Sequence, residues 1–298
     1  MPYLQRWLGV GVSVVVLGVV ACGGDDETAP TKATTQASSG CGKTGAAKGL
    51  QEKQSVQVDG KKRTYELFVG DAHDGSSPLP LVFILHGGSG TGAGIRKGFA
   101  IEKEAAGKAI FVYPDATNDY PNSWDLDDSA EKNVDIKFFD ALREKIASDY
   151  CVDSQRVFAW GSSAGGFMAN QLACRRGSVI RGIASNSGGG PYGGPDEDGL
   201  YDDSGNFTCP DKPVAALVIH GEKDTSVSLD DGKESVKYWR RANGCTEGDG
   251  ADYAPSPCKQ LPGCASERPT VFCEIPGMGH TIWPEHGTDV VWKFFSSL

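Results

Sequence analysis

The stretch RVFAWGSSAGGFMANQLAC, residues 156–174, decides how this chain is expected to fold. The apolar run 157–160 is typical of a buried central strand, and residues 166–174 predict a helix that packs through its apolar side chains. Between them, residues 161–165 read Gly-Ser-Ser-Ala-Gly, the G-x-S-x-G pattern of a nucleophile elbow in its strand–turn–helix context. Ser163 is therefore the candidate nucleophile. Because the pattern alone also fits an ordinary Gly/Ser turn, the assignment depends on whether a base, an acid and an oxyanion hole occur elsewhere.

The length and composition of the chain indicate one soluble α/β domain. Its 298 residues, of which 39% are hydrophobic, suffice to bury one large core. The net charge of −10 and the pI near 5.0 argue against a nucleic-acid partner, because phosphate binding needs a basic surface. The longest basic runs are the short ones at 61–63 and 240–241. We expect a monomer that needs no cofactor and acts on neutral or weakly polar substrates.

The N-terminus carries an export signal. An apolar run from 7 to 21 is too short to span a membrane comfortably and has the flanks of a secretory signal, so residues 1–21 are predicted to be a signal peptide. The run ends in Val-Val-Ala-Cys, which resembles a bacterial lipobox and predicts lipidation of Cys22; an ordinary signal peptide that discards this cysteine is the alternative. Residues 22–40 are small and polar and predict a flexible tether. The remainder, 41–298, is expected to be a single catalytic domain, secreted or held at a bacterial cell envelope by the lipid alone.

Eight further cysteines agree with export. An even number in an exported chain indicates up to four disulfides formed in an oxidising compartment. We hypothesise the pairs Cys41–Cys151 and Cys174–Cys209, with the last four cysteines paired among themselves. The pairing within this last group, Cys245, Cys258, Cys264 and Cys273, is not determined by the sequence, and both Cys245–Cys264 and Cys245–Cys273 are possible. No C-x-x-C pair occurs and the five histidines do not cluster, so we expect no metal site.

Apolar runs and helical periodicities alternate along the domain. Strands are expected at 55–58, 63–69, 79–85, 109–113, 157–160, 179–184, 214–219 and 270–275. Helices are expected at 95–109, 133–148, 166–174, 234–241 and 287–298. This alternation after an initial hairpin predicts an α/β fold with a mostly parallel central sheet, helices on both faces and disulfide-stabilised loops. The long Gly-rich excursion 188–210 is predicted to be a lid or substrate loop, and 245–269 an insertion.

Candidate acid and base residues follow two later strands. Asp224 and His280 each come directly after a predicted strand, at the carboxyl edge where open α/β sheets place their sites. The chain order Ser163, Asp224, His280 is that of the α/β-hydrolase fold. His280 is expected to accept the serine proton, and Asp224 to hold the tautomer of the imidazole. Two other histidines, His86 and His220, also end strands and are expected to be structural.

A glycine-rich loop, HGGSG at 86–90, follows the strand 79–85. It lacks the Gly-Lys-Ser/Thr ending and the G-x-G-x-x-G register of phosphate-binding loops. An H-G-G sequence after an early strand is instead the oxyanion-loop pattern that accompanies a nucleophile elbow. The backbone N–H groups of Gly88 and Ala164 are the expected donors to the oxyanion.

Four motifs together resemble a known family. They are LHGGSG at 85–90, YCVDSQRVFAWGSSAGGFMANQLAC at 150–174, VIHGEKD at 218–224 and GMGHTIWP at 277–284. From Cys41 onward the chain is similar to the exported polyhydroxybutyrate depolymerase / feruloyl esterase family, the esterase-D-like carbohydrate esterases. This resemblance implies an extracellular serine esterase with the catalytic residues Ser163, Asp224 and His280. The family's usual His-Thr-Trp-Pro carries an additional Ile282 here, which shifts Trp283, the position that corresponds to a substrate contact.

The resemblance narrows the substrate class without choosing one ester. It implies cleavage of feruloyl or acetyl esters on plant cell-wall polysaccharide, or of hydroxyalkanoate esters. An α/β-hydrolase peptidase is one alternative, and a non-catalytic surface lipoprotein that binds carbohydrate through exposed aromatic residues is another. Tyr120, Trp124 and Tyr192 lie in loops that are expected near the nucleophile, where stacking favours a feruloyl over an acetyl ester. Trp124 and Trp283 are the predicted substrate contacts.

Overall fold

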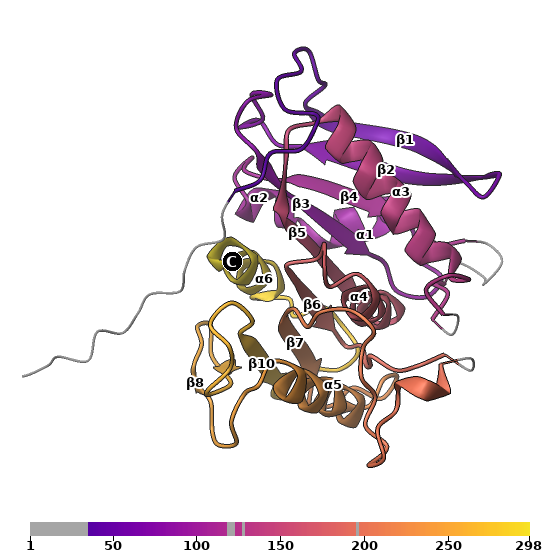
Figure 1. Cartoon of the computed structure of the whole chain (residues 1–298). Coiled ribbons are helices and arrows are strands. Elements are labelled where there is room, and N and C mark those ends of the chain that lie inside the picture. The colour runs from indigo at the N-terminus through magenta and orange to yellow at the C-terminus, as the bar shows by residue number, and fades with distance from the viewer. Residues whose placement is uncertain (1–34, 118–122, 127–128, 195–196) are drawn as a thin grey trace, which may run out of the picture.

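The computed structural model describes residues 35–117, 123–126, 129–194 and 197–298. The predicted signal peptide, Cys22, most of the predicted tether and Tyr120 lie outside these ranges. In the described residues, one ten-stranded sheet runs through the molecule in the order β1-β2-β4-β3-β5-β6-β7-β10-β9-β8 (Figure 1). The strands are β1 (Gly49–Val58), β2 (Lys61–Val69), β3 (Leu79–Leu85), β4 (Ile110–Pro114), β5 (Val152–Ser162), β6 (Gly182–Asn186), β7 (Ala215–Gly221), β8 (Ala251–Asp252), β9 (Lys259–Gln260) and β10 (Thr270–Ile275).

The centre of the sheet is parallel and its edges are antiparallel. Strands β4, β3, β5, β6, β7 and β10 pair in parallel register, whereas β1 and β2 at one edge and β9 and β8 at the other pair antiparallel. β1 and β2 form the predicted hairpin, in which Asp59 and Gly60 of the turn have φ values of 47° and 76°. The predicted α/β fold with a mostly parallel sheet is therefore confirmed.

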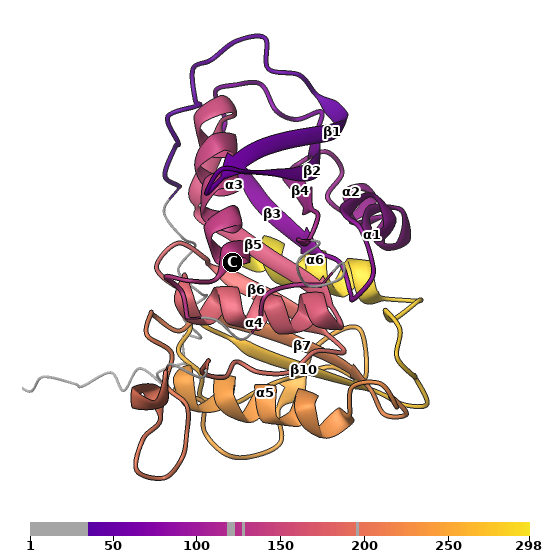
Figure 2. The ribbon, with the colours of Figure 1, turned by 90° about the vertical axis from the view of Figure 1, so that its right-hand side faces the viewer.

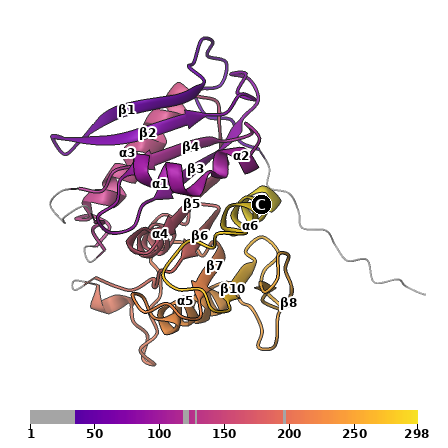
Figure 3. The same ribbon diagram turned by 180° about the vertical axis from the view of Figure 1, so that it is seen from behind.

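Helices cover both faces of the sheet. α3, α4 and α5 pack on one face and α1, α2 and α6 on the other, as the front and back views show (Figure 1, Figure 3). The helices are α1 (Gly92–Phe99), α2 (Ile101–Glu104), α3 (Val134–Asp149), α4 (Ala164–Arg175), α5 (Leu229–Ala242) and α6 (Gly287–Ser297), with a 3-10 turn, η1 (Asp198–Leu200). Two apolar cores result, one on each side of the sheet.

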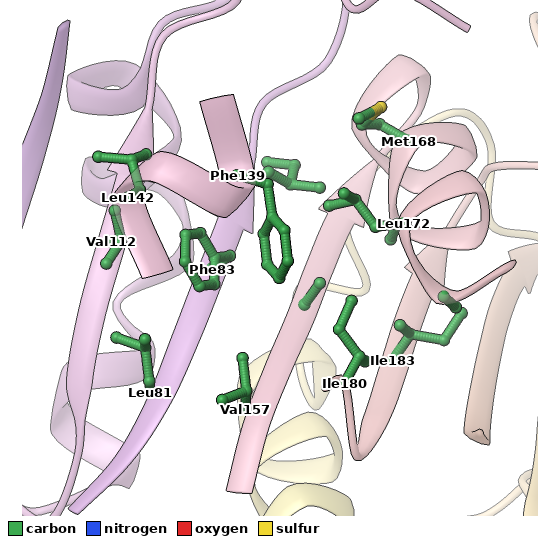
Figure 4. Packing of buried hydrophobic residues seen from close by; sticks show 14 of the residues in the cluster. Leu81, Phe83, Val112, Phe139, Leu142, Val157, Met168, Leu172, Ile180 and Ile183 are labelled. Carbon is green, nitrogen blue, oxygen red and sulfur yellow. The ribbon is translucent and has the colours of Figure 1, made fainter. Parts of the chain in front are cut away.

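Strand β3 shows how one apolar run serves both cores. All seven of its residues are buried, and successive side chains point to opposite faces. Leu81 and Phe83 join the core beneath α3, α4 and α5, where the Phe83 and Phe139 ring centroids lie 4.6 Å apart (Figure 4). Val82 and Ile84 join the core beneath α1, α2 and α6. Because both faces are covered, the strand is apolar at every position and fixes the sheet edge from which the functional loops emerge.

Two helices differ from their predicted bounds. The single helix predicted at 95–109 is wrong, because the chain forms the separate short helices α1 and α2. Ala100, between them, has φ 44° and ends α1 by donating its N–H to the carbonyl of Arg96. α5 begins earlier than predicted, because Ser228 and Asp231 form a capping box at its first turn.

The strand predicted at 179–184 is shorter than expected. β6 begins only at Gly182. The N–H groups of Val179 and Ile180 both donate to the carbonyl of Arg176 in a turn that follows α4. These apolar residues therefore complete the end of a helix rather than the beginning of a strand.

Four disulfides tie the loops to the scaffold. The hypothesised pairs Cys41–Cys151 and Cys174–Cys209 are confirmed. For the last four cysteines, the structure has Cys245–Cys264 and Cys258–Cys273. Cys174–Cys209 joins the last turn of α4 to the end of the lid, residues 188–210, which lies beside α5.

Candidate active site

Ser163 lies on a sharp turn between β5 and α4. Its backbone angles, φ 56° and ψ −123°, fall in a region that L-residues rarely adopt. A Cβ atom on Gly161 would lie 2.0 Å from the carbonyl oxygen of Gly165, and a Cβ on Gly165 would lie 2.1 Å from that of Leu85. Both positions therefore require glycine, because the backbone of the strand and that of the helix approach closely. This is the strand–turn–helix elbow that the sequence predicts.

Three side chains from three different loops meet at the carboxyl edge of the sheet. The Nε2 atom of His280 lies 2.9 Å from Oγ of Ser163, and its Nδ1 atom lies 2.8 and 3.0 Å from the two carboxylate oxygens of Asp224. Nδ1 therefore carries the ring proton and donates a hydrogen bond to the carboxylate. This leaves Nε2 free to accept a hydrogen bond from the serine hydroxyl. The arrangement places a base within reach of a nucleophile and an acidic group behind the base.

The Asp224 carboxylate is held in its charged form. Its side chain is fully buried, and its Oδ1 atom accepts the N–H groups of Ser226 at 2.9 Å and Val227 at 3.0 Å. Burial acts to raise the pKa of Asp224, but the hydrogen bonds from His280 and from these two amides outweigh it, so the pKa lies below its ordinary value. A charged carboxylate at this position favours protonation of the adjacent imidazole.

Asn186, at the end of β6, connects the serine turn to the histidine loop. Its carbonyl accepts the N–H of Ser163 at 2.9 Å, and its side-chain amide donates to the carbonyl of Thr281, next to His280, at 2.9 Å. Asn186 is completely buried, so both bonds are shielded from water. Sequence analysis missed this residue, although a polar side chain at the carboxyl end of an apolar strand was the available signal.

The loop after β3 lies against the serine. A Cβ atom on Gly87 would lie 3.3 Å from the Cβ of Ser163, so the loop backbone passes directly beside the serine side chain. Gly88 is exposed in this loop. Ala164 is the first residue of α4, where backbone N–H groups have no partner within the helix. The structure thus brings the two segments that contain the expected oxyanion donors next to Ser163.

Two buried aromatic groups hold this loop. The Nδ1 atom of His86 lies 2.7 Å from the carbonyl oxygen of Gly87, and its Nε2 atom accepts the N–H of Ala116 at 3.0 Å. The ring is therefore neutral with its proton on Nδ1, and burial lowers the pKa of His86 further below its ordinary value. The indole N–H of Trp124 donates to the His86 carbonyl at 2.7 Å, and the two ring centroids are 4.8 Å apart. His86 has the structural place expected for it.

Sequence relatives decide the family. The chain is 33% identical to the probable feruloyl esterase C of Aspergillus terreus over 282 residues, which cover 89% of this chain and 93% of that protein. It is 32% identical to the feruloyl esterase C of Emericella nidulans over 257 residues, which cover 80% and 85% of the two chains. The chain belongs to this feruloyl esterase family. The esterase is accordingly a serine carboxylic ester hydrolase, as the motif resemblance implies.

Solved structures support the fold of this esterase. The acetyl xylan esterase from Aspergillus awamori superposes with a TM-score of 0.61 at 18% identity, over 83% of this chain and 100% of that one. A ferulic acid esterase from Anaeromyces mucronatus, solved in complex with ferulic acid, gives a TM-score of 0.54 at 16% identity, over 85% and 92% of the two chains. Residues 113–189, which contain the elbow, match the prolyl oligopeptidase family. All three likenesses agree with an α/β-hydrolase fold.

The two tryptophans predicted to contact substrate are buried instead. Trp124 is 4% exposed and Trp283 is 5% exposed. Trp124 packs against His86, as described above, whereas Trp283 joins the core beneath α6 and packs edge-on against His286 at 5.0 Å. The expectation that these rings face the substrate is therefore wrong, because each ring supports a loop of the esterase from inside. The direction of a loop side chain depends on tertiary packing, which a sequence pattern does not specify.

His220 holds the acid loop from the interior. It is completely buried, and its Nε2 atom lies 3.1 Å from the carbonyl oxygen of Val227 and 3.5 Å from Oδ2 of Asp224. Its Nδ1 atom has no hydrogen-bond partner among the described residues and faces Gly232, where a Cβ would approach it to 2.4 Å. His220 therefore donates from Nε2 toward the turn that carries Asp224, which agrees with the structural role expected for it.

The described ranges contain neither a cluster of metal-binding side chains nor a helix suited to span a membrane. No group of three or more His, Cys, Asp or Glu residues in those ranges is arranged to hold a metal ion. No helix of the described part of the chain combines the length and apolar character needed to cross a membrane. The apolar run 7–21 and Cys22 fall outside these ranges, so the signal peptide and the lipidation stay predictions.

Proposed function

We propose that the protein is an exported esterase that cleaves feruloyl or acetyl esters of plant cell-wall polysaccharide through an acyl-enzyme. Ser163 Oγ attacks the ester carbonyl carbon while Nε2 of His280 takes the hydroxyl proton. The oxyanion that forms accepts hydrogen bonds from the backbone N–H groups of Gly88 and Ala164. The charged Asp224 keeps the proton on Nδ1 and stabilises the imidazolium.

The acyl-enzyme then forms and breaks down with the same groups. The tetrahedral intermediate collapses as the polysaccharide hydroxyl leaves, and the leaving oxygen takes the proton that His280 holds. A water molecule then gives a proton to His280 and attacks the acyl carbon. The second intermediate releases the carboxylic acid and returns the proton to Ser163.

One observation carries this proposal: the hydrogen-bonded series from Ser163 through His280 to Asp224 at an elbow with a rare backbone conformation. A free serine hydroxyl is a weak nucleophile at neutral pH. A neighbouring imidazole with a fixed tautomer removes this limitation, because it accepts the proton as the new bond forms.

The substrate class is supported by the relatives and by the exposure of the site. Two relatives are named feruloyl esterase C, and the fold neighbours include an acetyl xylan esterase and a ferulic acid esterase with ferulic acid bound. Ser163 is half-buried, and Gly88 and His280 are exposed, so an ester carried on a polymer can approach from solvent. Hydroxyalkanoate esters and peptides are the competing substrates.

A substrate panel with two serine variants tests the proposal. The panel contains methyl ferulate, acetylated xylan, hydroxybutyrate oligomers and a chromogenic peptide, assayed with wild type, Ser163→Ala and Ser162→Ala. Ser163→Ala removes the nucleophile from a preformed turn and is expected to lower kcat by about 10⁴- to 10⁶-fold. Ser162→Ala is the matched control and is expected to keep kcat within about tenfold of wild type. Faster turnover of hydroxybutyrate oligomers or of the peptide than of the first two substrates would contradict the proposed substrate class.

We further propose that the esterase acts outside the cytoplasm as a monomer anchored by a lipid on Cys22. The four disulfides support folding in an oxidising compartment. Labelled palmitate supplied to a bacterial host that makes the full chain is expected to enter the wild type and not Cys22→Ser, which should be released from the membrane fraction. Equal labelling of both proteins would contradict lipidation at this cysteine.

A further inference from the structure

A groove lies beside the lid, apart from the three side chains that meet at Ser163. It has a volume of about 750 Å³ and lies between lid residues and α5, which run side by side in two views (Figure 1, Figure 2). Tyr192, Tyr201 and Phe207 line it from the lid, and Tyr238 lines it from α5. The proposed catalytic chemistry uses none of these residues.

Three aromatic rings, tilted against one another, form one wall of the groove. The ring centroids of Tyr201 and Phe207 are 5.3 Å apart, and those of Phe207 and Tyr238 are 6.3 Å apart. Tyr201 is 42% exposed, a larger fraction than for any other large hydrophobic side chain in the described part of the chain. An aromatic ring has a partly negative face that attracts the partly positive hydrogens of C–H groups. The Tyr201 ring is therefore partly open to solvent, with Phe207 packed against it and its hydroxyl accepting the N–H of Gly193 at 3.1 Å.

The lid that carries this wall is cross-linked to α4. The Cys174–Cys209 disulfide joins the two elements covalently. The neighbouring Arg175 is buried, donates to the carbonyl of Tyr192 at 3.3 Å and pairs with Glu197. A binding surface that is already ordered loses little conformational entropy when a ligand arrives.

Polar side chains of both signs flank the aromatic wall. Glu234 and Lys237 of α5 form an ion pair at 3.3 Å, and Arg240 and Glu247 form another at 3.0 Å. All four residues line the groove. Arg241 also lines the groove, donates to the carbonyl of Phe207 and lies over the Tyr238 ring at 5.6 Å. The groove therefore offers hydrogen-bond donors and acceptors of both signs, with one cation in excess. A neutral ligand with many hydroxyl groups matches this surface.

An aromatic contact connects the groove to α4, the helix that begins directly after Ser163. Phe167 lies in the first turn of this helix. The Phe167 ring packs edge-on against Tyr192, with centroids 6.4 Å apart, and Tyr192 lines the groove. Phe167 and Tyr192 therefore lie between the start of α4, next to Ser163, and the groove.

We infer that this groove binds a neutral oligosaccharide chain, with Tyr201 as its stacking platform. A pyranose ring presents C–H groups on its faces and hydroxyl groups on its edges, which complements an aromatic face flanked by charged side chains. The inference rests on the proposed function for the polymer that carries the ester. It does not depend on the ester chemistry, because the binding needs neither an ester nor a nucleophile.

Binding of ester-free xylohexaose, measured by isothermal titration calorimetry, tests the inference. Tyr201→Ala is expected to raise the Kd by about threefold to tenfold relative to wild type, because it removes the aromatic ring on which a sugar would stack. Tyr201→Phe is the matched control, since it keeps the ring, and its Kd is expected to stay within about twofold. Both variants should keep the kcat/KM of wild type for methyl ferulate. For feruloylated xylan, Tyr201→Ala should lower kcat/KM by about the same factor by which it raises the Kd for xylohexaose. The change should lie in KM, with kcat unchanged.

Three results would overturn the inference: no binding of xylohexaose by wild type, equal Kd values for wild type and Tyr201→Ala, or tighter binding of hydroxybutyrate oligomers than of xylohexaose. The outcome is separable from that of the proposed function. Xylohexaose binding that depends on Tyr201 in a protein without esterase activity supports the groove and refutes the ester chemistry. Ester cleavage without xylohexaose binding refutes the groove alone.

Discussion

The two loops that flank Ser163 are stabilised in different ways. The loop after β3 is held from the interior, by the neutral ring of His86 and the indole N–H of Trp124. The lid is held by a disulfide and by the ion pair of Arg175 with Glu197, and it leaves the ring of Tyr201 exposed. Buried hydrogen bonds fix the positions of backbone N–H donors within a narrow range of distances. A cross-link fixes the path of a loop but leaves its outer surface exposed to solvent. The first loop is therefore expected to govern kcat, and the lid to govern stability and polymer binding.

The largest expected effect is the loss of the base at the sheet edge. His280→Ala should lower the kcat/KM for methyl ferulate by about 10⁴- to 10⁶-fold, because Ser163 then has no proton acceptor. The fold should be retained, because Asp224 keeps the hydrogen bonds from the N–H groups of Ser226 and Val227. His286→Ala, in the same loop region and also away from the interior, is the control and should keep kcat/KM within about threefold. Comparable losses in both variants would show that the loop, and not the base, was disrupted.

Removal of the lid disulfide should affect stability more than chemistry. The double variant Cys174→Ala/Cys209→Ala is expected to lower the free energy of unfolding by about 2–4 kcal/mol, because the cross-link closes a loop with a sequence separation of 35. The kcat for methyl ferulate should be retained, and the KM for feruloylated xylan should rise. Urea unfolding under non-reducing conditions and steady-state kinetics measure the two effects. Cys258→Ala/Cys273→Ala, a disulfide whose residues do not line the groove, is the control, for which a stability loss without any change in xylan KM is expected.

Trp124→Phe, in contrast to the loss of the lid disulfide, should lower kcat and leave polymer binding unchanged. It leaves the buried carbonyl of His86 without its indole donor, which costs about 1–3 kcal/mol of stability. The kcat values for methyl ferulate and for an acetyl ester of the same alcohol should fall by the same factor, because the oxyanion loop serves both. A loss of preference for ferulate with unchanged acetyl turnover would instead indicate that the ring stacks on the acyl group.

The smallest expected effect is on the pH dependence of stability. Burial lowers the pKa of His86, although the hydrogen bond to Gly87 opposes this. Below about pH 6.5, His86 of the unfolded chain binds a proton that His86 of the folded chain binds less readily. Its contribution to the free energy of unfolding is therefore fully present above this pH and is lost as the pH falls toward the pKa of the folded state. His73, whose pKa burial also lowers, adds a dependence of the same sign. Urea unfolding from about pH 5 to about pH 8 should therefore show that the free energy of unfolding depends less steeply on pH in His86→Gln than in wild type.

Those parts of the site that depend on backbone geometry could be predicted from the sequence. A Cβ atom on Gly161 or Gly165 would lie about 2 Å from a backbone oxygen, so the elbow requires glycine at both positions and the residue types predict it. Asp224 and His280 follow apolar runs that form parallel strands, and parallel strands bring their carboxyl ends to one edge. The disulfide from Cys174 to Cys209 followed from the expected position of the lid.

Features that depend on side-chain direction could not be predicted in this way. Trp124 and Trp283 lie in loops, where no periodicity indicates whether a ring faces the solvent or the core. Asn186 acts through one carbonyl and one amide that reach two different loops, and such long-range contacts leave only a weak trace in the sequence. The helix predicted at 95–109 is interrupted at Ala100, where an alanine and not a glycine takes the left-handed conformation, so the residue type gave no signal of the break.

The attachment site of a fluorophosphonate tests the central claim most directly. Such a probe reacts with an activated serine hydroxyl, and peptide mapping by mass spectrometry locates the adduct. The account predicts a single adduct on Ser163 in the native protein and no adduct in His280→Ala under the same conditions, because the hydroxyl is then not activated. An adduct on Ser162 or Ser89 with Ser163 unmodified would contradict it.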